Sequence, residues 1–315
     1  MALDPKLLAR LGPLQVRARK VMEGVLTGLH QSPQHGQSVE FAEHKEYAPG
    51  DEIRHIDWRA YAKVDRYYVK RFEMETNLRA LLVVDASGSM AYGRGGVSKL
   101  EYASICAGAL AVLLARQGDQ VGLLLAGSGA AAGEERLPAG VRGFLPFAAS
   151  AAHVQEVLRR LEAARGEGPT VLPAALDFAA EKAGRRALIV VLSDLFDPSE
   201  QTVPALKRLR SRRHDLLVLQ TLDREELDFP FDDPTRFLSM EDERQIDAQP
   251  RQIRQSYLAE LRRFLEQTRR ELTRADVEYE LIPTDAAPDR ELLKLLRRRE
   301  AGGGPSRPAH RAGPE

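Results

Sequence analysis

Three polar side chains alternate directly after an apolar run, in the sequence Val83-Val84-Asp85-Ala86-Ser87-Gly88-Ser89. Residues at i, i+2 and i+4 of an extended or gently turning chain face the same way, so Asp85, Ser87 and Ser89 would present one carboxylate and two hydroxyls to one point. Such hard oxygen donors suit Mg²⁺, which takes one or two protein carboxylates and keeps several waters. The same residue types also favour ordinary turns, so a strand-ending turn is the alternative.

Two later positions could complete a cation site. Thr170 precedes a helix expected from residue 172, and Asp194 follows the apolar run 187–192. We expect both near the first three residues, because open α/β sheets bind ligands at the carboxyl ends of their strands. The alternatives are a helix N-cap for Thr170 and a helix or turn cap for Asp194 or Asp197. We interpret Asp85 as an exposed strand end whose carboxylate repels that of Asp194.

Other catalytic chemistries lack their motifs. The glycines at 93–96 do not form the frame of a phosphate-binding loop, and Ser87 lacks the flanking glycines of a hydrolase elbow. Cys106 lies in an apolar stretch without a nearby histidine, which indicates a buried side chain and not a nucleophile. A magnesium-dependent hydrolase or phosphotransferase that uses Asp85 remains the enzymatic alternative, although it has no clear nucleophile or general base.

Residues 79–300 alternate between apolar runs and helical patterns. We predict strands at 81–84, 120–126, 187–192, 216–221 and 277–282, and helices at 100–117, 154–164, 172–183, 202–213, 253–274 and 289–299. Continuously apolar strands joined by helices imply a mostly parallel sheet that is covered on both faces. The expected fold class is therefore a doubly wound, Rossmann-type α/β domain.

Both ends of the chain differ from this pattern. Residues 1–78 combine helical segments at 6–29, interrupted by Gly12-Pro13, with turn-rich sequence and a strand within 67–75. Within this N-terminal extension, the segment from residue 40 to residue 63 has too few apolar residues for its own core. We therefore expect the extension to pack on the α/β domain and Trp58 to be largely buried. Residues 301–315 are rich in glycine and proline, which predicts a disordered tail.

Composition limits the classes of protein that the chain can be. The 315 residues hold 46 Lys and Arg and 46 Asp and Glu, so the formal net charge is zero and a nucleic-acid partner is disfavoured. The single cysteine excludes an internal disulfide. We find no apolar run long enough for a membrane span and no secretory signal, and we therefore expect a cytoplasmic location.

The five candidate ligands resemble the metal-ion-dependent adhesion site of von Willebrand factor A domains, in the order typical of that motif. A second resemblance is more specific and points to the bacterial family called domain of unknown function 58, whose members are von Willebrand factor A-like proteins associated with MoxR-type ATPases. It is carried by Gly50-Asp51, Arg54, Ile56-Asp57-Trp58 and Ala62-Lys63. Lys45 stands where the family usually has arginine, and the two transmembrane helices of many relatives are not found.

The resemblance implies a non-enzymatic protein-interaction module. Its metal ligands would be Asp85, Ser87, Ser89, Thr170 and Asp194, its cofactor Mg²⁺ or alternatively Mn²⁺ or Ca²⁺, and its partners a MoxR-type AAA+ ATPase and a client protein that presents an acidic side chain. The role would be the assembly or maturation of protein complexes. The residues from 50 to 63 could form either a structural clasp or a partner-recognition surface, and we favour the clasp.

Overall fold

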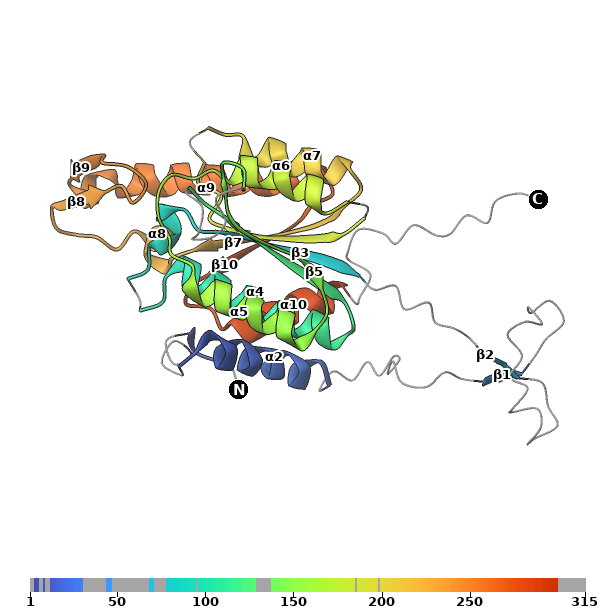
Figure 1. Cartoon of the computed structure of the whole chain (residues 1–315). Coiled ribbons are helices and arrows are strands. Elements are labelled where there is room, and N and C mark those ends of the chain that lie inside the picture. Colours follow the sequence, from blue (N-terminus) through green and yellow to red (C-terminus); the bar gives the residue numbers. More distant parts are fainter. Residues whose placement is uncertain are drawn as a thin grey trace. The chain divides into compact units, whose positions relative to one another are not determined.

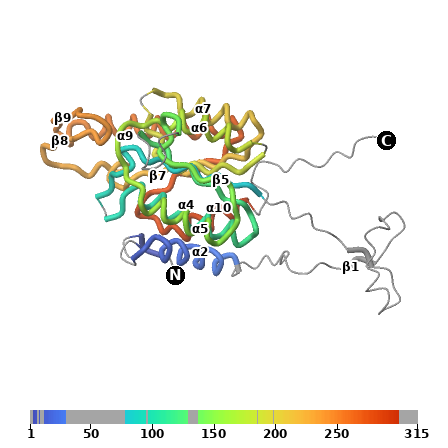
Figure 2. Tube along the Cα trace, viewed as in Figure 1, coloured from blue at the N-terminus to red at the C-terminus, as the bar shows by residue number. Residues whose placement is uncertain are grey.

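The computed structural model describes residues 3–5, 8, 12–30, 44–46, 68–70, 78–94, 96–128, 137–184, 186–197 and 199–299. The chain divides into two units, one formed by Met1–His30 with Leu78–Glu315 and the other by Gln31–Asn77. Figure 2 follows the chain through the larger unit, which contains every candidate ligand.

A six-stranded sheet forms the centre of the larger unit in the described part of the chain. Its strands lie in the order β10-β7-β6-β3-β4-β5, and all are parallel except β5, which pairs antiparallel with β4. Their bounds are β3 Arg79–Asp85, β4 Gln120–Ala126, β5 Val141–Ala148, β6 Leu188–Ser193, β7 Asp215–Leu222 and β10 Glu278–Pro283. This is the strand order of a doubly wound sheet, so the predicted fold class is confirmed.

Helices cover both faces of the sheet (Figure 1). One face carries α4 (Lys99–Arg116), α5 (Ala151–Ala163) and α10 (Pro288–Arg298), with α2 (Leu14–His30) packed on the outside of these helices. The other face carries α6 (Leu172–Lys182), α7 (Thr202–Ser211) and α9 (Pro250–Arg274). The alternation of β3 explains both layers, because Leu82 and Val84 enter the first core while Leu81 and Val83 enter the second. The sheet is thus buried on both sides, as its continuous apolar strands predict.

Three kinds of element were missing from the sequence prediction. Strand β5 contains Gly143 and Pro146, which interrupt a strand pattern but are tolerated at the edge of a sheet. The hairpin of β8 (Thr235–Leu238) and β9 (Gln245–Ala248) is largely exposed and polar, so it gives no apolar run to detect. The short helices η2 (Gly88–Ala91) and α8 (Arg224–Asp228) complete the connections.

Helix α2 begins directly after Gly12-Pro13, where the sequence predicted a break, and it packs on α4, α5 and α10. Val21 of this helix is 0 % exposed and Val16 is 48 % exposed. We expect Val21→Ala to lower the free energy of unfolding by about 2 kcal/mol, because two buried methyl groups are lost and leave a cavity. Val16→Ala is the matched control, and urea denaturation of both variants measures the difference. Equal stability of the two variants would contradict this packing of α2.

The smaller unit is described only at β1 (His44–Glu46) and β2 (Tyr68–Lys70), which pair antiparallel. Strand β2 lies within the strand predicted at 67–75. The predicted clasp from residue 50 to residue 63, including Trp58, lies outside the described residues, as does the tail 301–315. Where the structure describes the chain, each helix is too short or too polar to cross a bilayer.

Candidate functional site

The site begins where the central strand β3 ends, at Asp85. One carboxylate oxygen, Oδ1, accepts a hydrogen bond from the Ser87 amide at 3.0 Å, and Oδ2 accepts one from the Ser193 hydroxyl at 2.6 Å. Asp85 is only 1 % exposed. The interpretation of Asp85 as an exposed strand end was therefore wrong, because the neighbouring strand β6 continues to Ser193 and covers the carboxylate from the side.

The two serine hydroxyls of the motif lie together. Ser87 Oγ is 3.2 Å from Ser89 Oγ, at the start of the short helix η2. The Gly88 amide donates a hydrogen bond to the Gly168 carbonyl at 2.8 Å, so the connection that leads to Thr170 is fastened to the same loop. The carboxylate and both hydroxyls thus lie together at the carboxyl edge of the sheet.

Asp194 has a partner that the sequence analysis missed. Its Oδ2 lies 2.7 Å from Lys99 Nζ, and the same ammonium lies 2.6 Å from Glu226 Oε1. Lys99 is 0 % exposed although it stands at the first position of α4. A lysine in the first turn of a helix opposes the helix dipole, and this was the one signal in the sequence that could have singled it out.

Charge and burial shift the titration of this group of residues. Burial alone lowers the pKa of Lys99, but the carboxylates of Asp194 and Glu226 outweigh it and leave the pKa above its ordinary value. Burial, reinforced by the nearby charge of Asp194, raises the pKa of Asp85 to about 6. When ionised, Asp85, Asp194 and Glu226 carry three negative charges against the single positive charge of Lys99. The site therefore holds an excess of buried negative charge.

Thr170 binds a carboxylate that comes from the same chain. Its amide donates to Glu241 Oε2 at 3.0 Å, and its hydroxyl donates to Glu241 Oε1 at 2.6 Å. Glu241 lies in the connection between β8 and β9. Thr170 is not the N-cap of α6, since Val171 holds that position without a side-chain hydrogen bond. The capping alternative for Thr170 was therefore wrong.

Asp194 and Asp197 both accept backbone hydrogen bonds, as the alternative interpretation of these residues as turn or helix caps predicted. Asp194 Oδ1 accepts a hydrogen bond from the Phe196 amide at 3.0 Å, and Asp197 Oδ2 accepts one from the Thr202 amide at 2.8 Å, at the start of α7. Asp197 therefore caps the start of α7. Asp194 combines the turn contact with its ion pair to Lys99.

The donor set fits a hard divalent cation in part. Asp85, Ser87 and Ser89 supply oxygen ligands beside an excess of negative charge, whereas Thr170 and Asp194 already have partners in Glu241 and Lys99. Among the described residues, no group of three or more His, Cys, Asp or Glu is arranged to hold a metal ion. A cation here would depend on hydroxyl and water ligands, as Mg²⁺ accepts. The five-residue assignment stays a prediction.

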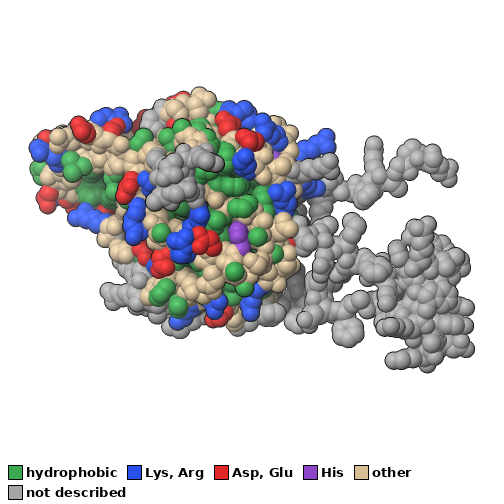
Figure 3. Space-filling view, viewed as in Figure 1, with side chains coloured by type: hydrophobic (Ala, Val, Ile, Leu, Met, Phe, Trp, Pro, Cys, Tyr) green, Lys and Arg blue, Asp and Glu red, His purple; other side chains and the backbone are tan. Residues whose placement is uncertain are grey.

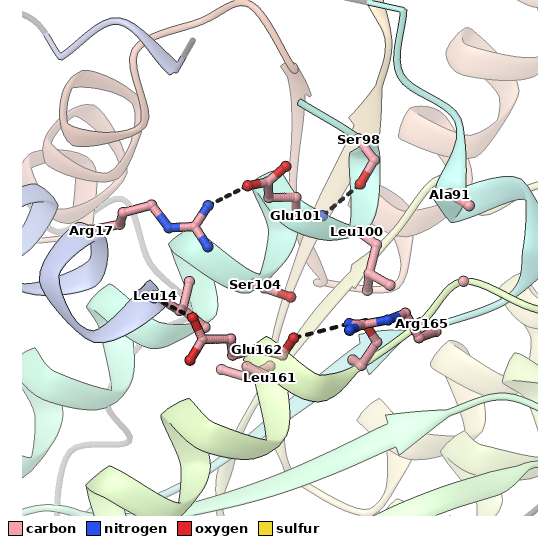
Figure 4. Close-up of a pocket in the computed structure, with 12 residues that line it drawn as sticks. Leu14, Arg17, Ala91, Ser98, Leu100, Glu101, Ser104, Leu161, Glu162 and Arg165 are labelled. Carbon is pink, nitrogen blue, oxygen red and sulfur yellow. Dashed lines mark hydrogen bonds and ion pairs between the residues drawn. The ribbon is translucent and has the colours of Figure 1, made fainter. Parts of the chain in front are cut away.

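Two hollows lie near these residues. A groove of about 520 Å³ is bordered by Ser89, Phe196, Glu241 and Phe264, and thus opens beside the motif. A second cavity, of about 320 Å³, lies between α2, α4 and α5 and contains none of the predicted ligands (Figure 4). There Arg17 of α2 forms an ion pair with Glu101 of α4, which fastens the two helices together.

The chain belongs to the family described as protein of unknown function DUF58, whose family pattern matches residues 43–267. The recognised family is therefore confirmed. The uncharacterized protein Rv1480 of Mycobacterium tuberculosis is 29 % identical over 231 residues, which cover 72 % of this chain and 68 % of that protein. The uncharacterized protein Mb1516 of Mycobacterium bovis matches to the same extent.

Solved structures with a partly similar fold include the conserved hypothetical protein BatB from Bacteroides thetaiotaomicron. It is 15 % identical with a TM-score of 0.43, and the match covers 71 % of this chain and 99 % of BatB. The VWA domain of SpRpn10 is 10 % identical with a TM-score of 0.39, and the match covers 69 % of this chain and 94 % of that domain.

Proposed function

We propose that this chain is a protein-interaction module that recognises an acidic side chain of its partner with the help of a divalent cation. The observation that carries the proposal is the cluster of the Asp85 carboxylate with the Ser87 and Ser89 hydroxyls, beside an excess of buried negative charge at the carboxyl edge of the sheet. Bound Mg²⁺, or Mn²⁺ or Ca²⁺ in its place, would supply positive charge and an open coordination position for a carboxylate.

Each residue has a separate task in this proposal. Asp85 supplies the negative charge that holds the cation, and Ser193 and the Ser87 amide keep its carboxylate in place. Ser87, Ser89 and Thr170 supply hydroxyl oxygens to the cation, and the Thr170 oxygen can do so while its hydrogen is donated to a carboxylate. Asp194 contributes its nearby negative charge, and its ion pair with Lys99 fixes the orientation of its carboxylate and offsets part of the negative charge of the site.

The enzymatic alternative has less support. A hydrolase or phosphotransferase would need a nucleophile or a general base beside Asp85. The sequence contains neither the frame of a phosphate-binding loop nor the flanking glycines of a hydrolase elbow. We therefore favour binding over catalysis.

The finer identity of the partners rests on the family resemblance. We propose that the chain works with a MoxR-type AAA+ ATPase in the cytoplasm and binds a client protein through an acidic side chain. Affinity capture with the wild-type chain and with Asp85→Ala, each with Mg²⁺ and with chelator, tests this partnership. Recovery of the same ATPase and client in all four samples would contradict cation-dependent recognition.

Cation binding itself is tested without a partner. We expect Asp85→Ala to weaken Mg²⁺ binding by at least about tenfold, because the variant loses the carboxylate of the motif. Isothermal titration calorimetry and the rise of Tm with added Mg²⁺ measure the effect. Asp177→Ala, which removes an exposed carboxylate from α6, is the matched control. If the wild-type chain and both variants respond equally to Mg²⁺, the cation site does not exist.

A further inference from the structure

The tip of the β8–β9 hairpin, defined here as residues 239–244, reaches the candidate site. Its Glu241 accepts both polar hydrogens that Thr170 offers, one from the amide and one from the hydroxyl. The Ser239 hydroxyl in turn accepts from the Glu241 amide at 3.3 Å, and the Ser239 amide donates to the Arg244 carbonyl at 2.8 Å. The turn is therefore organised so that Glu241 points at Thr170.

The backbone of the tip also fits closely against the motif. A Cβ atom added to Gly88 would lie 1.9 Å from the Met240 carbonyl oxygen. Any side chain at position 88 would therefore push the tip away, and only glycine permits the contact that is observed. The tip thus covers the loop between Ser87 and Ser89 as well as Thr170.

The base of the hairpin is held separately from its tip. Phe237 of β8 packs on Phe229 and Phe231, and Phe229 packs on Tyr257 of α9. Leu238 and Ile246 remain 67 % and 65 % exposed, and Figure 3 shows hydrophobic side chains among charged ones at this end of the molecule. An anchored base allows the tip to leave the site while the hairpin stays attached.

We propose that the amide and hydroxyl of Thr170 form a carboxylate-binding position, which Glu241 fills from within the chain and an acidic side chain of the partner fills after displacing the tip. The role of the partner rests on the proposed function, whereas the contact between Thr170 and Glu241 does not. The hairpin is then an internal competitor of the partner. It keeps the donors of Thr170 satisfied until the partner's carboxylate replaces Glu241.

The test uses the full chain, with chelator and without any partner, so that a failure of cation binding cannot affect the outcome. The probe is N-acetylglutamate amide, with N-acetylglutamine amide as the neutral comparison. In Glu241→Ala, we expect the Thr170 amide to exchange hydrogen at least about tenfold faster than in the wild type, because a charge-assisted hydrogen bond is lost. The glutamate probe should shift the Thr170 amide resonance in this variant and not in the wild type.

Glu243→Ala is the matched control, because it removes an exposed carboxylate from the same tip. It should behave as the wild type in both measurements. Glu241→Gln, which keeps the shape of the side chain, should also expose Thr170 to the probe. Unchanged exchange of the Thr170 amide in Glu241→Ala would overturn the proposal. So would an equal response to the probe in the wild type and in this variant.

Discussion

Replacing Lys99 with methionine is expected to lower the free energy of unfolding by about 3–5 kcal/mol, because loss of a buried charge partner leaves the opposite charges uncompensated. Asp194 and Glu226 both contact the ammonium, at 2.7 and 2.6 Å, and methionine offers them no hydrogen bond. For a unit of this size the fall in Tm should be roughly 10 °C. Thermal unfolding followed by circular dichroism measures it.

Two further variants separate charge from packing in this prediction. Lys182→Met removes an exposed lysine that pairs with Glu181, and such surface pairs contribute about 0–1 kcal/mol. Adding Glu226→Gln to Lys99→Met should recover part of the lost stability, since one of the two unpaired charges disappears. A Lys99→Met chain as stable as Lys182→Met would show that the ammonium does not compensate these carboxylates.

The second large effect is a pH dependence of stability that belongs to Asp85. Its pKa rises from the ordinary 3.8 to about 6 in the folded chain, because of burial and then the charge of Asp194. The folded chain therefore holds this proton more tightly than the unfolded chain does. Below pH 4, where Asp85 is protonated, the tighter binding of its proton stabilises the folded chain. This stabilisation is lost as the pH rises from 4 towards 6 and above.

Asp85→Asn removes this titration and keeps the shape of the side chain. With chelator present, we expect the wild type to lose stability relative to Asp85→Asn as the pH rises from 4 to 7. The difference in the free energy of unfolding should change by up to about 3 kcal/mol in favour of the variant. Urea denaturation at a series of pH values measures the difference. Asp177→Asn, at an exposed position of α6, serves as the control. A difference for Asp85→Asn that stays constant across this range would refute the raised pKa.

The fold class could be predicted because strands that are buried on both faces are recognisable in the sequence. Strands β3, β6 and β7 are buried along nearly their whole length, so apolar side chains on both faces appear in the sequence as continuous runs. The edge strand β5 and the β8–β9 hairpin are not buried on both faces, so they do not need continuous apolar runs. Their sequences contain proline, glycine and exposed polar residues, and neither was expected.

The sequence by itself determined the part of the candidate site that is formed by neighbouring residues of one segment. Asp85, Ser87 and Ser89 lie within five residues of one another, so backbone geometry alone brings them together once β3 ends. It also predicted that Thr170, just before a helix, and Asp194, just after a strand, lie near the same edge of the sheet.

Only the tertiary structure decided which partners these residues have. Lys99 and Asp194 are 95 positions apart, and Thr170 and Glu241 are 71 positions apart, so no local pattern links them. The physical reason is that a buried charge or donor must be satisfied by whatever group the packing of distant elements places beside it. In this chain the first turn of α4 supplies an ammonium to Asp194, and the tip of the β8–β9 hairpin supplies a carboxylate to Thr170.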